Sequence, residues 1–126
     1  RNMPQIFSVY QIVIDKDLAD LINKEGHNCH VKSLARMQAM LEGDVRLGVM
    51  HDCYTKVAEV VADDLEHVFE VGNIGPEDRI TRLDKMHSIS VGDIIADADG
   101  VCSVVNNVGF TPLAPSFHKM VLKEAA

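Results

Sequence analysis

Two short segments place histidine and cysteine close together, which is the combination that zinc sites use. His27, Cys29 and His30 lie in one segment, and His51 and Cys53 form a His-x-Cys pair in the other. If the two segments met in space, four of these side chains would surround a metal ion. The chain has no Cys-x-x-Cys knuckle, so solvated loop histidines and small buried thiols are the alternative. We expect no cofactor and retain these five residues as candidate metal ligands.

A second set of residues offers the groups of a nucleophilic hydrolase. His87 would act as base, Ser88 as nucleophile and Asp93 as the orienting carboxylate. The same three roles could be filled by His51, Ser90 and Asp52. No Gly-x-Ser-x-Gly elbow surrounds any serine, and both serines also suit the start of a strand. A small hydrolase or metal-dependent enzyme is therefore our second hypothesis on function.

Basic side chains gather between positions 79 and 87. Arg79, Arg82, Lys85 and His87, which we call the basic strip, could contact an acidic partner, although a solvated strand face would explain them equally well. The whole chain carries 19 acidic and 12 basic groups, for a net charge of -7. A negative molecule repels nucleic acids, so we expect the basic strip to bind a protein.

The composition predicts one domain over residues 1–126, since 126 residues suit a single core and 47% of them are apolar. No run approaches the roughly 20 apolar residues of a membrane span, and we expect no membrane contact. The start lacks the order of a secretory signal, so we expect a cytoplasmic protein. Three cysteines are an odd number, which favours free thiols over disulfides.

The elements that must position these residues begin with a strand over Gln5–Ile14, apolar on both faces and therefore central in a sheet. A helix follows, capped by Asp15 or Asp17 and ended by Gly26. The spacing predicts a second helix over Ser33–Glu42, with Gly43 after it. Its apolar side carries Leu34, Met37, Met40 and Leu41. Met37, Met40 and Met50 fill a core or line an adaptable binding surface.

A strand and a helix are predicted next. Residues Tyr54–Ala62 are rich in valine and alanine and read as a strand. Asp63 and Glu66 have the spacing of a capping box, and Gly72 would end the helix that they start.

The second half, from about 79 to 113, is rich in β-hairpins. Short strands are predicted over 79–83, 91–96, 101–105 and 110–113, with a hairpin turn at Asp99-Gly100. A helix after Pro115 would carry Phe117, Met120, Val121 and Glu124 on one side. The fold class is therefore α+β, a mostly antiparallel sheet with three or four short helices.

One string in this half resembles a known type of sequence. Residues 86–95 read MHSISVGDII, and Asp99-Gly100 and Val108-Gly109-Phe110 follow. The pattern is similar to that of small proteins encoded by phages and mobile elements, including YodL-like domains. On the residues alone, Gly92 allows a tight backbone path and Asp93 bonds neighbouring amides, so the motif specifies fold.

The resemblance implies an accessory role in a phage or mobile element, in the host cytoplasm. We therefore expect a non-enzymatic protein that binds a host or phage protein through the basic strip or an exposed sheet edge. Unpaired edges in the β-rich half would also allow a homo-oligomer.

Overall fold

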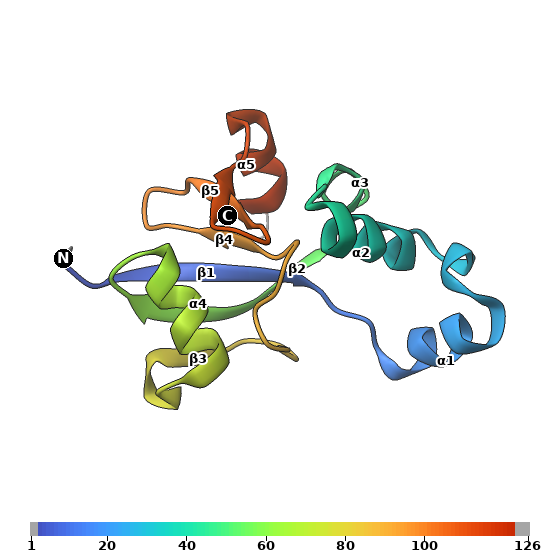
Figure 1. The fold of residues 1–126 in the computed structure, drawn as a ribbon, viewed down its shortest axis with the longest axis horizontal. Coiled ribbons are helices and arrows are strands. Elements are labelled where there is room, and N and C mark those ends of the chain that lie inside the picture. Colours follow the sequence, from blue (N-terminus) through green and yellow to red (C-terminus); the bar gives the residue numbers. More distant parts are fainter. Residues whose placement is uncertain (1–2, 123–126) are drawn as a thin grey trace.

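Six strands form one antiparallel sheet in the computed structural model, which describes residues 3–122 (Figure 1). They are β1 (Gln5–Ile12), β2 (Tyr54–Ala62), β3 (Ile80–Arg82), β4 (Ile94–Ala96), β5 (Cys102–Val105) and β6 (Phe110–Pro112). Their order across the sheet is β3-β2-β1-β4-β5-β6, and every neighbouring pair is antiparallel. The predicted α+β class and the central position of the first strand are confirmed.

Five α-helices accompany the sheet within the described residues. They are α1 (Lys16–Glu25), α2 (Val31–Glu42), α3 (Arg46–Met50), α4 (Leu65–Ile74) and α5 (Pro115–Leu122), with 3-10 turns η1 (His27–Cys29) and η2 (Glu77–Arg79). The expected three or four helices correspond to α1, α2, α4 and α5, whereas the short α3 was not predicted. None of the helices in residues 3–122 combines the length and apolar character needed to cross a membrane.

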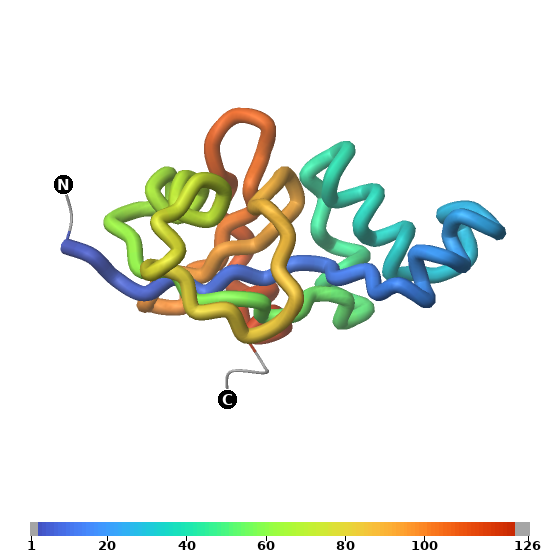
Figure 2. Tube along the Cα trace, turned by 90° about the horizontal axis from the view of Figure 1, so that it is seen from below, coloured from blue at the N-terminus to red at the C-terminus, as the bar shows by residue number. Residues whose placement is uncertain are grey.

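The two faces of the sheet carry separate apolar cores, and alternate residues of β1 enter each of them. Phe7 and Val9 join the core that contains Val68 and Val71 of α4. Tyr10 and Ile12 join the core to which α2, α3 and α5 contribute. Figure 2 shows α4 and α5 on opposite sides of the sheet. The second half of β1 is buried on both faces, which is why apolar residues point to both sides of the sheet there.

α1 stands apart from both cores. Figures 1 and 2 place it at one end of the molecule, beyond the end of β1, and none of its residues is buried. Its ends are as predicted: the Asp15 side chain accepts a hydrogen bond from the Leu18 amide, and Gly26 follows with a φ of 91°.

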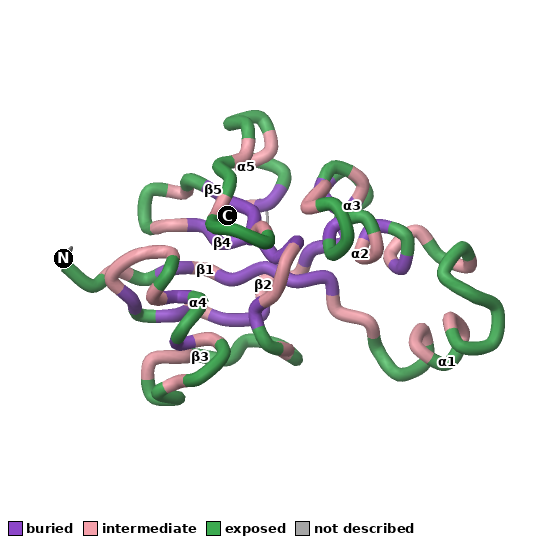
Figure 3. The backbone as a smooth tube through the Cα atoms, viewed as in Figure 1, coloured by how far each residue is buried: buried purple, intermediate pink, exposed green. Residues whose placement is uncertain are grey.

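The expected apolar side of α2 is wrong. Leu34, Met40 and Leu41 are exposed, and the buried residues are the small Ser33, Ala35 and Ala39. Figure 3 shows exposed and buried stretches along the same helix. Small residues are needed because a loop backbone packs directly on this side: a Cβ on Gly92 would lie 2.6 Å from Ala39. The helix also begins two residues earlier than predicted, since the His30 ring accepts from the Lys32 amide and caps it.

The predicted ends of α4 are also corrected. Asp64, rather than Asp63, is the cap, and its carboxylate accepts from the His67 amide at 2.8 Å. The helix runs through Gly72 to Gly75, whose φ is 102°. Gly72 serves packing, because a Cβ there would collide with the Ile89 side chain.

The second half follows the predicted hairpins with shorter strands. β4 and β5 pair as expected, and Gly100 has a φ of 84° in the turn between them. β4 begins only at Ile94, because residues 91 and 92 form a turn. The last helix forms from Pro115 to Leu122, and Glu124 lies outside the described residues.

Candidate functional site

A buried polar cluster joins the end of β1 to residues 87–93. The Gln11 side chain, which is 0% exposed, donates from Nε2 to the His87 carbonyl oxygen at 2.9 Å and to Asp93 Oδ2 at 3.0 Å. Its Oε1 accepts from the His87 amide at 3.1 Å. Sequence reasoning missed this role, although a cue was available: Gln11 stands among apolar residues in the second half of a central strand.

Asp93 is the buried carboxyl of this cluster, with 5% of its surface exposed. Besides the bond from Gln11, its Oδ2 accepts from the Ser90 amide at 3.0 Å, as the motif predicted. Burial raises the pKa of Asp93 to about 6, although the Ser90 bond and the charges of His87 and Arg36 act in the opposite direction. The carboxyl group therefore changes its protonation state near pH 6, well above the ordinary range of an aspartate.

His87 lies beside Asp93, but its ring contacts the backbone. Nδ1 is 2.8 Å from the carbonyl oxygen of Ser88, and because a carbonyl only accepts, Nδ1 carries the proton. Nε2 is buried and has no hydrogen-bond partner among residues 3–122. Ser88 itself is exposed. The structure thus brings the three candidate catalytic residues into one loop, where the imidazole meets a carbonyl group instead of the hydroxyl that a nucleophilic triad requires.

The basic strip follows the outer strand β3 and the chain after it. Arg82 forms a two-bonded ion pair with Glu77, at 2.7 and 3.1 Å. Arg79 donates to the Val61 carbonyl oxygen at 3.2 Å. Arg82 and His87 also line a groove of about 290 Å³, which is bounded on its other side by the last residues of α4. Two of the four residues of the basic strip therefore border a surface depression.

The candidate metal ligands make other contacts. The His27 ring is 3.0 Å from the Ser33 hydroxyl, and the His30 ring caps α2. Burial raises the pKa of the Cys53 thiol, which disfavours the thiolate that binds zinc. Within residues 3–122, no three histidine, cysteine, aspartate or glutamate side chains are grouped so that they could hold a metal ion.

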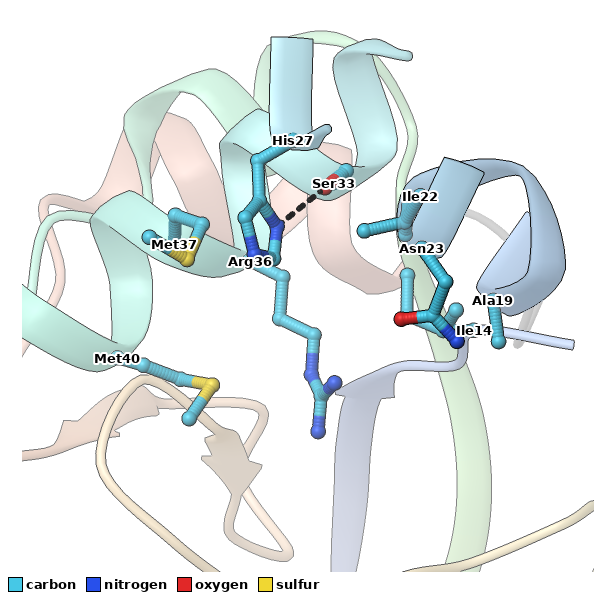
Figure 4. Close-up of a pocket in the computed structure, with 9 residues that line it drawn as sticks. All are labelled: Ile14, Ala19, Ile22, Asn23, His27, Ser33, Arg36, Met37 and Met40. Atoms are coloured by element: carbon cyan, nitrogen blue, oxygen red, sulfur yellow. Dashed lines mark hydrogen bonds between the residues drawn. The ribbon is translucent and has the colours of Figure 1, made fainter. Parts of the chain in front are cut away.

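A second groove separates α1 from α2 (Figure 4). It encloses about 260 Å³, and its lining is mostly apolar. The residues around it are Ile14, Ala19, Ile22, Asn23, His27, Ser33, Arg36, Met37 and Met40. Met37 and Met40 thus line a surface, which is the second of the two roles considered for them. The groove itself was not predicted, because it depends on how far α1 stands from α2.

Comparisons with protein families, with curated proteins and with solved structures found no match to this chain.

Proposed function

We propose that this chain is a non-enzymatic binding protein, an accessory factor of the phage or mobile-element type, that contacts an acidic segment of a host or phage protein through the basic strip. The observation that carries the proposal is the position of β3, which ends the sheet and has β2 as its strand neighbour on one side alone. An edge strand offers unpaired backbone groups to an incoming chain. Here that edge is flanked by three cationic side chains.

The contacts of the motif residues favour binding over catalysis. Gln11, His87 and Asp93 direct their polar groups at one another and at the backbone, which fixes the path of residues 87–93. That segment follows the basic strip directly, so the cluster holds its end in place. A rigid loop loses less conformational entropy when a partner binds than a mobile one does.

The surface around β3 combines charge with apolar groups. Leu83, directly after the strand, is 51% exposed, and Ile74 at the end of α4 is 84% exposed. Ile74 lines the groove together with Arg82 and His87, and Leu83 directly follows Arg82 in the chain. Such a surface suits an acidic segment with apolar side chains, because the cations position it and the apolar contacts stabilise it.

Site-specific photo-crosslinking tests the proposal. A crosslinking amino acid at position 83 should capture a defined protein from a lysate of the host, whereas one at Val108, 94% exposed between β5 and β6, should not. Replacing Arg79, Arg82 and Lys85 together by glutamate should abolish that product. The matched control replaces Lys16, Lys24 and Lys32 by glutamate, an equal change of charge, and should leave the product intact.

Two results would contradict this function. Capture of the same proteins from positions 83 and 108 would mean that the chain contacts proteins without a defined binding surface. If capture survives the triple replacement in the basic strip, the partner is not held there through acidic groups. A second copy of the chain at the same edge would instead give a crosslinked dimer of the purified protein.

A further inference from the structure

The groove between α1 and α2 has two apolar walls that do not pack against each other. Met37 and Met40 of α2 form one wall, and Ala19 and Ile22 of α1 form the other, with Ile14 between them in the link from β1 to α1 (Figure 4). The groove is therefore bounded by α1, η1 and α2, together with Ile14 from the segment before α1. The apolar stripe of an amphipathic helix normally packs against its neighbour. Here the stripe of α1 is only partly buried, and Ala19 and Ile22 line the groove.

Methionine suits a wall that has to adapt to a ligand. Its side chain is flexible and polarizable, and it fits apolar shapes of different outline. Met37 is partly buried and Met40 is 44% exposed, so neither is fixed within a closed core. The two side chains can therefore move against an apolar body placed between the walls.

Arg36 adds a cation to this apolar groove. Its side chain extends along the groove, and its guanidinium lies between Met40 and Ile14 in Figure 4. Within residues 3–122, the guanidinium takes part in no hydrogen bond and no ion pair. The nearby Asp93 feels its charge, but that carboxyl is buried and accepts its bonds from Gln11 and Ser90. The guanidinium thus keeps its donors for a carboxylate, which it can bind with two hydrogen bonds.

We propose that this groove binds a small organic carboxylate with an apolar body, such as a medium-length alkyl or aryl acid. The carboxylate pairs with Arg36, and the apolar body lies between the methionines of α2 and Ile22 of α1. A volume of about 260 Å³ is close to the lower end of small-molecule pockets. A single cation beside apolar walls matches one anionic head and one apolar body. This site is distant in the sequence from the basic strip, and it does not depend on the function proposed above.

Methionine methyl resonances give a direct test in the intact chain. The protein is labelled with ¹³C at its methionine methyl groups and titrated with octanoate, with phenylacetate and with octanol, the uncharged counterpart of octanoate. Both acids should shift the Met37 and Met40 signals saturably. The signals of Met3 and Met50, which do not line the groove, should stay in place and serve as internal controls. Octanol should bind at least tenfold more weakly than octanoate, because it lacks the charged group.

Arg36→Gln tests the anchor. It should weaken octanoate binding about tenfold or more, since it removes a charge-assisted pair. Lys32→Gln on the same helix removes an equal charge outside the groove and should change the affinity less than about twofold. The methyl spectrum of each variant also reports whether it is folded. The triple replacement in the basic strip should leave octanoate binding intact, which separates this site from the proposed function.

Several outcomes would overturn the proposal. Equal affinities for octanoate and octanol would mean that the groove binds apolar molecules without recognising a charge. An Arg36→Gln variant that binds octanoate as tightly as the wild type would show that Arg36 does not hold the carboxylate. If neither acid gives saturable shifts of the Met37 and Met40 signals up to about 10 mM, small organic carboxylates are excluded as ligands of the groove. Tight binding of an acidic amphipathic helical peptide in that last case would assign the groove to a protein partner instead.

Discussion

Gln11 donates from Nε2 to Asp93 Oδ2 across 3.0 Å, a buried bond between residues 82 positions apart. The same amide nitrogen also reaches the His87 carbonyl oxygen. One side chain of the central strand therefore fixes the loop that leads from the basic strip to β4. The first three predictions concern the stability of this arrangement.

Replacing Gln11 by leucine should lower the free energy of unfolding by about 2 to 4 kcal/mol, because the backbone groups of His87 and the Asp93 carboxyl lose buried partners. Gln38→Leu is the control, since Gln38 is exposed on α2, and it should change stability by less than about 0.5 kcal/mol. Urea unfolding followed by circular dichroism measures both. Equal losses in the two variants would mean that the buried bonds contribute little.

The stability of the protein should depend on the protonation of Asp93. In the unfolded chain this carboxyl has its ordinary pKa of 3.8, whereas burial raises it to about 6 in the folded protein. Between these values the folded state holds more protons, so the free energy of unfolding falls as the pH rises from about 4 to 6 and levels off above that. The total change is about 3 kcal/mol at most.

Asp93→Asn removes this titration while keeping the shape of the side chain. Denaturation at a series of pH values should give a wild-type curve that falls relative to the variant between pH 4 and 6. The difference between the two proteins isolates Asp93 from the other acidic groups. Parallel curves across that window would show that Asp93 titrates normally in the folded state.

Gly92→Ala should destabilise the protein by about 3 kcal/mol or more. Gly92 has a φ of 91°, and an added Cβ would lie 2.6 Å from three atoms of Ala39, two of them in the backbone of α2. Gly109→Ala separates the two causes, because Gly109 has a φ of 74° but no atom within 4 Å of its Cβ position. That variant should lose only about 1 to 2 kcal/mol. Thermal unfolding of both variants makes the comparison, and a similar loss in each would assign the effect to φ alone.

Arg82→Ala should leave stability within about 0.5 kcal/mol of the wild type, although the ion pair with Glu77 has two good bonds. The pair is exposed to solvent, where screening and side-chain entropy offset its attraction. A loss well above about 1 kcal/mol in chemical denaturation would mean that the pair holds β3 in place. The arginine would then belong to the fold more than to the binding surface.

The sequence was informative where local pattern decides structure. β2 has the predicted bounds, and the cap of α1 at Asp15 is one of the two expected residues. Helix caps and strand periodicity involve residues within a few positions of one another, so they can be read from a single chain. The hairpin at Gly100 belongs to the same group, because a positive φ and a short turn are local requirements.

The sequence was misleading where contacts between distant segments decide the structure. The buried side of α2 is set by the close approach of Gly92, 53 positions from Ala39, and this approach excludes the larger leucines and methionines. The role of Gln11 is of the same kind, since its partners lie in another half of the chain. The candidate site residues His87 and Asp93 were found by type, but their contacts depend on the Gln11 side chain that pattern reasoning passed over.

The separation of α1 from both cores has a consequence for hydrogen exchange. A helix that buries none of its residues is held mainly by its own backbone bonds and its two caps, so its amides can open without disturbing the sheet. They should exchange with deuterium far sooner than the amides of β1, although the two elements are adjacent in the chain. An occupant bridging α1 and α2 would slow that exchange. The protection of the ten residues of α1 would then report whether the groove is occupied.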